Sequence, residues 1–204
     1  MQKIMFNDRY GLTDAVIDYI KNNTRRIEGG RQFQLAATAA EDFTYEEATG
    51  CIVMCCQGIE IFRHKCRYKV GEIVAVAQSY EQVYRQGNMN ADEAIIRGLK
   101  YDPGMCNKMY VRAALMPHQI RITGIRYERL QDISDEECMR EGILESWYES
   151  TDTTTYGYAD EKKGTAVEFD TPREAFAALI DKVSGRGTWG CNPWVVAYEF
   201  ELVK

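Results

Sequence analysis

One short run of the sequence, Ile73-Val74-Ala75-Val76-Ala77, limits the folds that are open to this chain. The run is apolar at every position, which is typical of a β-strand that is covered on both faces. Such a strand needs other elements packed around it, so the sequence predicts a sheet with helices packed on it. The 204 residues are enough for one domain of this kind.

Further segments have the pattern of β-strands. Residues 51–56 and 59–64 flank Gln57-Gly58, and this arrangement predicts a hairpin. Residues 120–130 are interrupted by Gly124, which indicates a bulge. The chain ends in a strand in which apolar and acidic residues alternate: Val196, Tyr198, Phe200 and Leu202 against Glu199 and Glu201.

Short helices and one loop are expected between these strands. A capping box at Ser134 and the pair Thr171-Pro172 each predict the start of a helix. Residues 31–36 fit a short strand, and residues 150–166 have no period and are expected to form a mobile loop. We therefore predict an α+β fold over residues 1–204, in which a small mixed β-barrel is flanked by short helices.

Composition excludes some functional classes. The net charge of −6 disfavours a protein that coats nucleic acid nonspecifically, although a local basic pocket stays possible. The N-terminal residues lack the apolar run of a signal peptide, and no apolar stretch approaches about 18 residues. We expect a cytoplasmic protein with no membrane contact. The seven cysteines contain no Cys-x-x-Cys pair, so we expect free thiols, no metal and no cofactor.

Two basic segments are candidates for binding. Lys21-Asn22-Asn23-Thr24-Arg25-Arg26 follows a helix predicted from about Thr13 to Asn22, and it places an amine, a hydroxyl and two guanidiniums on one loop. Such a group can bind a phosphate, a carboxylate or a base edge. A lysine beside a threonine hydroxyl can also activate a nucleophile. The second segment, Arg63-His64-Lys65-x-Arg67-x-Lys69, either contacts a phosphate backbone or is a solvated hairpin end.

The order of several motifs resembles the ASCH-domain family of the PUA-like superfamily, in the long form found in phages and prophages. The matching segments run in order from residue 12 to residue 203: Lys21-x-x-Thr24-Arg25-Arg26, Tyr68-Lys69-Val70-Gly71-Glu72 with the apolar strand, residues 121–133, Glu141-Gly142-Ile143, and Trp189-x-x-Asn192-Pro193-Trp194-Val195. The resemblance implies a PUA-like β-barrel with flanking helices and a cleft beside the Lys/Thr/Arg loop. The family usually has glycine where this chain has Tyr19.

The resemblance also implies a function. The function that we expect first is the binding of RNA, or of a modified or unmodified nucleotide, in the cleft beside the Lys/Thr/Arg loop. Some small bacterial members of the family are amidohydrolases that deacetylate acetylcytidine, and their Lys, Thr and Glu correspond here to Lys21, Thr24 and Glu141. A third alternative is a phage or prophage accessory protein that acts by binding another protein.

Lys21, Thr24 and Glu141 are therefore the catalytic candidates, as base, nucleophile and acid for the leaving amine. Alternatively, Lys21 and Glu141 form a surface ion pair and Thr24 caps a turn. In either case the RNA or nucleotide ligand would approach through the same cleft.

The candidates for ligand binding are Arg26, Arg25, Gln78 and Trp194. Neighbouring residues of an extended segment point to opposite faces, so only one of the two arginines enters the cleft. The family position favours Arg26, and Arg25 is expected to be a solvated charge. Gln78 ends the apolar strand, where the long form often has Trp-Val-Arg-Glu. Trp194 either stacks on a base or packs in the core.

Overall fold

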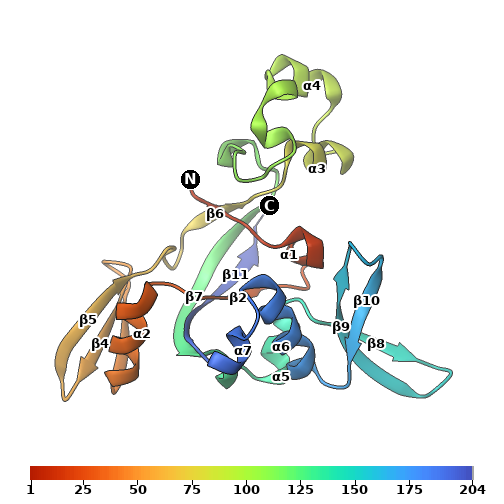
Figure 1. Cartoon of the computed structure of the whole chain (residues 1–204). Coiled ribbons are helices and arrows are strands. Elements are labelled where there is room, and N and C mark those ends of the chain that lie inside the picture. The colour runs from red at the N-terminus through yellow and green to blue at the C-terminus, as the bar shows by residue number, and fades with distance from the viewer. Residues whose placement is uncertain (204) are drawn as a thin grey trace.

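The computed structural model describes residues 1–203, apart from the side chain of Ile96. Three sheets and several short helices form a mixed α+β fold (Figure 1). In the largest sheet β1 pairs with β6 in parallel and the other pairs are antiparallel. The order of its strands is linear, with β1 and β2 at the two edges: β1 (Lys3–Ile4), β6 (Ile73–Val76), β7 (Gln119–Arg129), β11 (Trp194–Leu202) and β2 (Asn23–Arg26).

Two three-stranded sheets flank the main sheet. One contains β3 (Asp42–Glu46), β4 (Cys51–Cys56) and β5 (Ile59–Lys65), which confirms the predicted hairpin. The other contains β8 (Leu144–Tyr148), β9 (Thr153–Asp160) and β10 (Thr165–Phe169).

The prediction of an irregular loop over residues 150–166 is wrong, because most of this segment forms β9 and the start of β10. Thr and Tyr, in which it is rich, favour strands. Gly157 lies where the pairing is closest, since a Cβ at this position would lie 2.3 Å from the Val167 carbonyl oxygen.

The helices are α1 (Leu12–Ile17), α2 (Gly30–Ala39), α3 (Tyr80–Arg85), α4 (Ala91–Ile96), α5 (Asp135–Arg140), α6 (Pro172–Val183) and α7 (Thr188–Cys191). Short 3₁₀ helices cover Asp8–Tyr10, Leu99–Tyr101, Pro103–Met105, Ala113–Leu115 and Leu130–Asp132. The capping box of Ser134 and the cap of Thr171 are confirmed. Within the described residues no helix has the length and apolar character needed to cross a membrane.

Two other predictions of local structure need correction. Residues 31–36 belong to α2 and not to a strand, because Phe33 and Ala37 are buried at helical spacing. The helix expected from Thr13 to Asn22 begins at Leu12 and ends at Ile17. Gly11 is its N-cap, while the Thr13 hydroxyl donates to Asp8.

Residues 74–77 of the apolar run are covered on both faces, as predicted, while Ile73 at its start is exposed. Val74 and Val76 belong to the main core, in which the strands of the largest sheet meet α6 and β9. Ala75 and Ala77 belong to a second, smaller core that extends to Leu99. This second core lies under α3 and α4, which stand at one end of the molecule in Figure 1. The predicted bulge is present too, because the register of β7 and β11 shifts next to Gly124.

Candidate functional site

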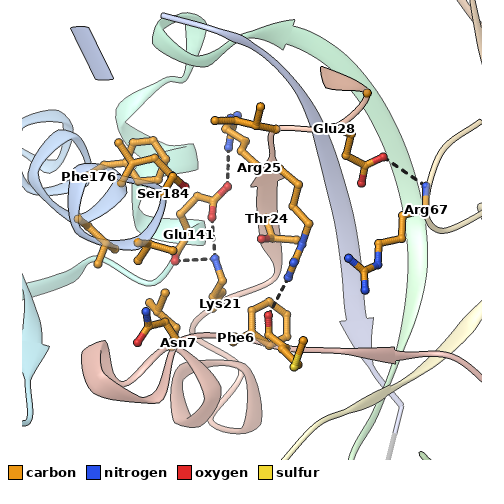
Figure 2. A pocket seen from close by; sticks show the side chains of 18 of the residues that line it. Phe6, Asn7, Lys21, Thr24, Arg25, Glu28, Arg67, Glu141, Phe176 and Ser184 are labelled. Atoms are coloured by element: carbon orange, nitrogen blue, oxygen red, sulfur yellow. Dashed lines mark hydrogen bonds and ion pairs between the residues drawn. The ribbon is translucent and has the colours of Figure 1, made fainter. Parts of the chain in front are cut away.

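A pocket of about 790 Å³ opens beside the edge strand β2. Its lining comes from segments that lie far apart in the sequence: the segment after β1, the chain from Lys21 to Gly29, the end of β5 with the residues after it, Glu141 directly after α5, and α6. In Figure 2, Phe176 of α6 and Ser184, the residue after α6, lie on one side of the pocket and Glu28 and Arg67 on the other. The catalytic candidates and both arginines of β2 line it: Lys21, Thr24, Arg25, Arg26 and Glu141.

The turn between α1 and β2 places Lys21 in the pocket. Tyr19 has a φ of +62°, so the backbone leaves α1 in the left-handed conformation that glycine adopts most easily. The amides of Ile20 and Lys21 then donate to the Ala15 carbonyl. Tyr19 therefore occupies a backbone position that glycine would adopt without strain.

The Lys21 ammonium is held by three acceptors. Its Nζ donates to Glu141 Oε2 at 2.6 Å, to the Glu141 carbonyl at 2.7 Å and to the Asn23 carbonyl at 2.7 Å. Gly142, with a φ of +102°, follows Glu141 in a backbone conformation that favours glycine. The two side chains form an ion pair, but a buried one, so the alternative of a surface ion pair is wrong. Burial lowers the pKa of Lys21, and Glu141 opposes that shift.

Arg25 is also buried, and the expectation that it is a solvated charge is wrong. Its side chain is 0% exposed, and its three nitrogens donate to Glu128 at 2.7 Å, Glu137 at 2.7 Å and Glu141 at 3.1 Å. Burial disfavours the charge, but the three carboxylates raise the pKa of Arg25. The alternation of Arg25 and Arg26 could not reveal these partners, because they lie more than 100 residues away in the sequence.

Lys21 and Arg25 belong to one connected set of charges, here called the buried ion-pair network. It contains four cations and four carboxylates: Lys21, Arg25, Arg126 and Arg140 with Glu128, Glu137, Glu141 and Glu199. Its centre, formed by Lys21, Arg25 and Glu141, is buried, while Arg126 and Arg140 are partly exposed. The ion pairs of the network join β2, β7, β11 and α5. Because the four positive and four negative charges balance, the network leaves no net charge for a ligand.

Thr24 lines the pocket, but no hydrogen bond joins its hydroxyl to Lys21 within the described part of the chain. An acyl-transfer mechanism needs a base within hydrogen-bond reach of the nucleophile. Lys21 instead uses its three ammonium protons on Glu141 and Asn23. In this arrangement Lys21 is a structural cation, and Thr24 is a polar group on the pocket wall.

Three other cations line the pocket without such partners. Within residues 1–203, no ion pair joins Arg26, Lys65 or Arg67 to a carboxylate. Arg26 Nη2 donates to the Met5 carbonyl at 2.9 Å, while Arg26 Nε is buried with no partner. Burial lowers the pKa of Arg26, but a guanidinium stays protonated in proteins. Lys65 and Arg67 are exposed at the mouth.

Glu28 is the remaining carboxylate of the lining. Its oxygens accept hydrogen bonds from the Tyr198 hydroxyl at 2.8 Å, from the Arg67 backbone amide at 3.3 Å, and meet His64 Nε2 at 3.2 Å. Figure 2 shows the contact between Glu28 and Arg67. These contacts fix the carboxylate beside the free cations.

Gln78 and Trp194, the two other candidates for ligand binding, do not line the pocket. The Gln78 amide is buried beyond β6 and donates to Gln86 at 2.7 Å. Trp194 stacks on Tyr127 with ring centroids 5.1 Å apart, and Arg129 covers it at 4.5 Å. Trp194 therefore packs with the core, which was the alternative to base stacking.

Sequence reasoning missed the apolar wall that Phe176, Leu179, Ile180 and Val183 of α6 contribute to the pocket. It also left open the role of the basic segment 63–69, in which Lys65 and Arg67 reach the pocket. Arg63 of the same segment pairs instead with Glu46 and Glu60. The density of basic residues in segment 63–69 was the signal in the sequence for the cationic side of the pocket.

No protein-family model, curated protein or solved structure matches this chain. The chemistry of the pocket is that of an anion site: cations at one side, apolar side chains at the other, and a fixed carboxylate between polar groups. Such a lining suits an amphipathic anion.

Proposed function

We propose that this protein binds RNA or a nucleotide in the pocket beside β2. The observation that carries the proposal is the division of the lining between the three unpaired cations Arg26, Lys65 and Arg67 and the apolar wall of α6. Guanidinium and ammonium groups bind phosphate oxygens, and an apolar surface packs against a base. The volume of about 790 Å³ lies within the range of small-molecule sites.

Charge on the rest of the molecule makes the pocket selective. The chain has a net charge of −6, so the protein as a whole does not attract a polyanion. The buried ion-pair network is neutral, which leaves the three free cations as the attractive part of the pocket. Affinity should therefore fall as the salt concentration rises.

Isothermal titration calorimetry with ribonucleoside monophosphates and short RNAs tests the proposal. Arg67→Gln removes an exposed guanidinium that has no carboxylate partner among the described residues, and Arg63→Gln is the matched control. We expect Arg67→Gln to weaken binding about tenfold or more, since a hydrogen bond to a charged group contributes about 1.5–3 kcal/mol. Arg63→Gln should bind as the wild type does. Equal affinity of the two variants, or no binding by the wild type, would contradict the proposal.

The amidohydrolase alternative requires Lys21 to give up a hydrogen bond and take the Thr24 proton. We favour binding over deacylation because Lys21 is occupied by three acceptors. Turnover of an acylated nucleoside by the wild type, and its loss in Thr24→Ala, would reverse this preference. The interaction with another protein stays a prediction from the sequence.

We propose in addition that the fold is PUA-like, as the ASCH resemblance implies. The long β7, which pairs with both β6 and β11, and the edge strand β2 beside the pocket support this. The five strands lie in linear order, and backbone contacts between the edge strands β1 and β2, measured by NMR, would establish a closed barrel. Their absence would leave an open sheet and would contradict this part of the proposal.

A further inference from the structure

The charges that remain in the pocket can be counted once the buried ion-pair network is set aside. Arg26, Lys65 and Arg67 contribute three positive charges, and Glu28 contributes one negative charge. With His64 neutral, the lining carries two net positive charges. The Glu28 carboxylate is held by Tyr198 and by the Arg67 amide, so its charge is a fixed part of the site.

This excess distinguishes two kinds of phosphate. A phosphomonoester, the terminal phosphate of a nucleotide, carries a charge of about −1.5 to −2 at pH 7 and has three free oxygens. A phosphodiester inside a nucleic-acid chain carries one negative charge per phosphate and has two free oxygens. The three free cations match the three free oxygens of the monoester. Together with Glu28 they give the lining a net charge of +2, which matches the charge of the monoester.

We infer that the pocket binds a terminal phosphate, a phosphomonoester, in preference to an internal phosphodiester. This inference rests on the proposed function and narrows its ligand class. The phosphate contacts Arg26, Lys65 and Arg67, and the nucleoside packs toward α6. A free mononucleotide and the phosphorylated end of an oligonucleotide share this chemistry.

The test compares each ribonucleoside 5′- and 3′-monophosphate with its methyl ester, which is a phosphodiester of the same nucleoside. At pH 7.5 we expect the monophosphate to bind about tenfold or more tightly than the ester by calorimetry. The ratio should fall toward one at pH 5, because the second pKa of the phosphate is about 6.

The ratio of the affinity for the monophosphate to the affinity for its methyl ester separates protonation of the phosphate from changes in the protein. His64 Nε2 lies 3.2 Å from Glu28, beside the proposed phosphate position, and it faces the monophosphate and the methyl ester alike. Effects that are common to the two ligands cancel in the ratio, which therefore reports the second charge of the phosphate. Arg67→Gln should reduce the ratio at pH 7.5, and Arg63→Gln should leave it unchanged.

A trinucleotide with and without a 5′-phosphate identifies the source of the ligand. Tighter binding of the phosphorylated trinucleotide than of a mononucleotide supports an oligonucleotide end, and weaker binding supports a free nucleotide. Methyl esters that bind as tightly as the monophosphates, with Arg67→Gln still weakening both, would overturn the inference and leave the proposed function intact. Absence of binding by every nucleotide and RNA would overturn the proposed function itself.

Discussion

Glu141→Gln removes the one carboxylate that touches both Lys21 and Arg25. The Lys21 side chain is 2% exposed and would keep only neutral acceptors, so its charge would be buried without a counter-ion. Removing one partner of a buried ion pair costs about 3–5 kcal/mol of unfolding free energy. Glutamine has nearly the same shape, so this loss measures the charge and not a cavity. Arg25 keeps Glu128 and Glu137.

Lys21→Met provides the matched comparison. It leaves the Glu141 carboxylate with Arg25 as a partner and deprives two carbonyls of their donor. Each unsatisfied buried acceptor costs about 1–3 kcal/mol, so we expect Lys21→Met to lose about 2–6 kcal/mol, which is of the same order as the loss for Glu141→Gln. Glu47→Gln, at an exposed position, should stay within about 0.5 kcal/mol of the wild type.

Equilibrium unfolding in urea measures the free energy of unfolding of all three variants. The slope of this free energy against urea concentration should equal that of the wild type, which excludes a change in the unfolded state. A loss below about 1 kcal/mol for Glu141→Gln would refute the reasoning, because a buried pair cannot be broken so cheaply.

Two further predictions concern stability. Tyr19→Gly should raise the free energy of unfolding by up to about 1 kcal/mol, because glycine relieves the left-handed backbone at φ +62° and the tyrosine side chain is mostly exposed; a lower urea midpoint would contradict this. Burial of Glu137 favours the neutral acid, but Arg25, the Ser134 amide and Arg126 together hold its pKa below the usual value. Because the pKa of Glu137 is lower in the folded chain, the unfolded chain binds more protons. The stabilisation that the Glu137 carboxylate gives to the folded state is therefore present above a pH of about 4.3, and it is lost as the pH falls through the lower folded pKa. Glu137→Gln should flatten the fall of the urea midpoint with acid, and an unchanged slope would count against the assignment.

Local signals in the sequence predicted much of the fold. The capping box at Ser134 and the Thr171-Pro172 start depend on contacts within one turn, so they survive in any tertiary context. The prediction of a loop over residues 150–166 was wrong because β9 has a mixed burial pattern in which buried and exposed residues do not alternate. Its stability comes from pairing with β8 and β10, which a single segment does not reveal.

The candidate site was predicted in part. Lys21, Thr24, Arg26 and Glu141 line one pocket, although Glu141 was found through the ASCH resemblance and not through spacing. The sequence could not show which cations are neutralised. Arg25 and Lys21 have carboxylate partners more than 100 residues away, so their roles depend on how β7 and α5 fold against β2. A basic motif alone therefore does not distinguish a ligand-binding cation from a structural one.

The most direct test of the account is the structure of the protein with a bound ribonucleoside monophosphate. We expect phosphate oxygens within about 3 Å of nitrogens of Arg26 and Arg67, with the Lys21–Glu141 ion pair intact and the nucleoside against α6. A phosphate that displaces Glu141 from Lys21, or a nucleotide bound outside the pocket, would contradict the division between structural and ligand-binding cations.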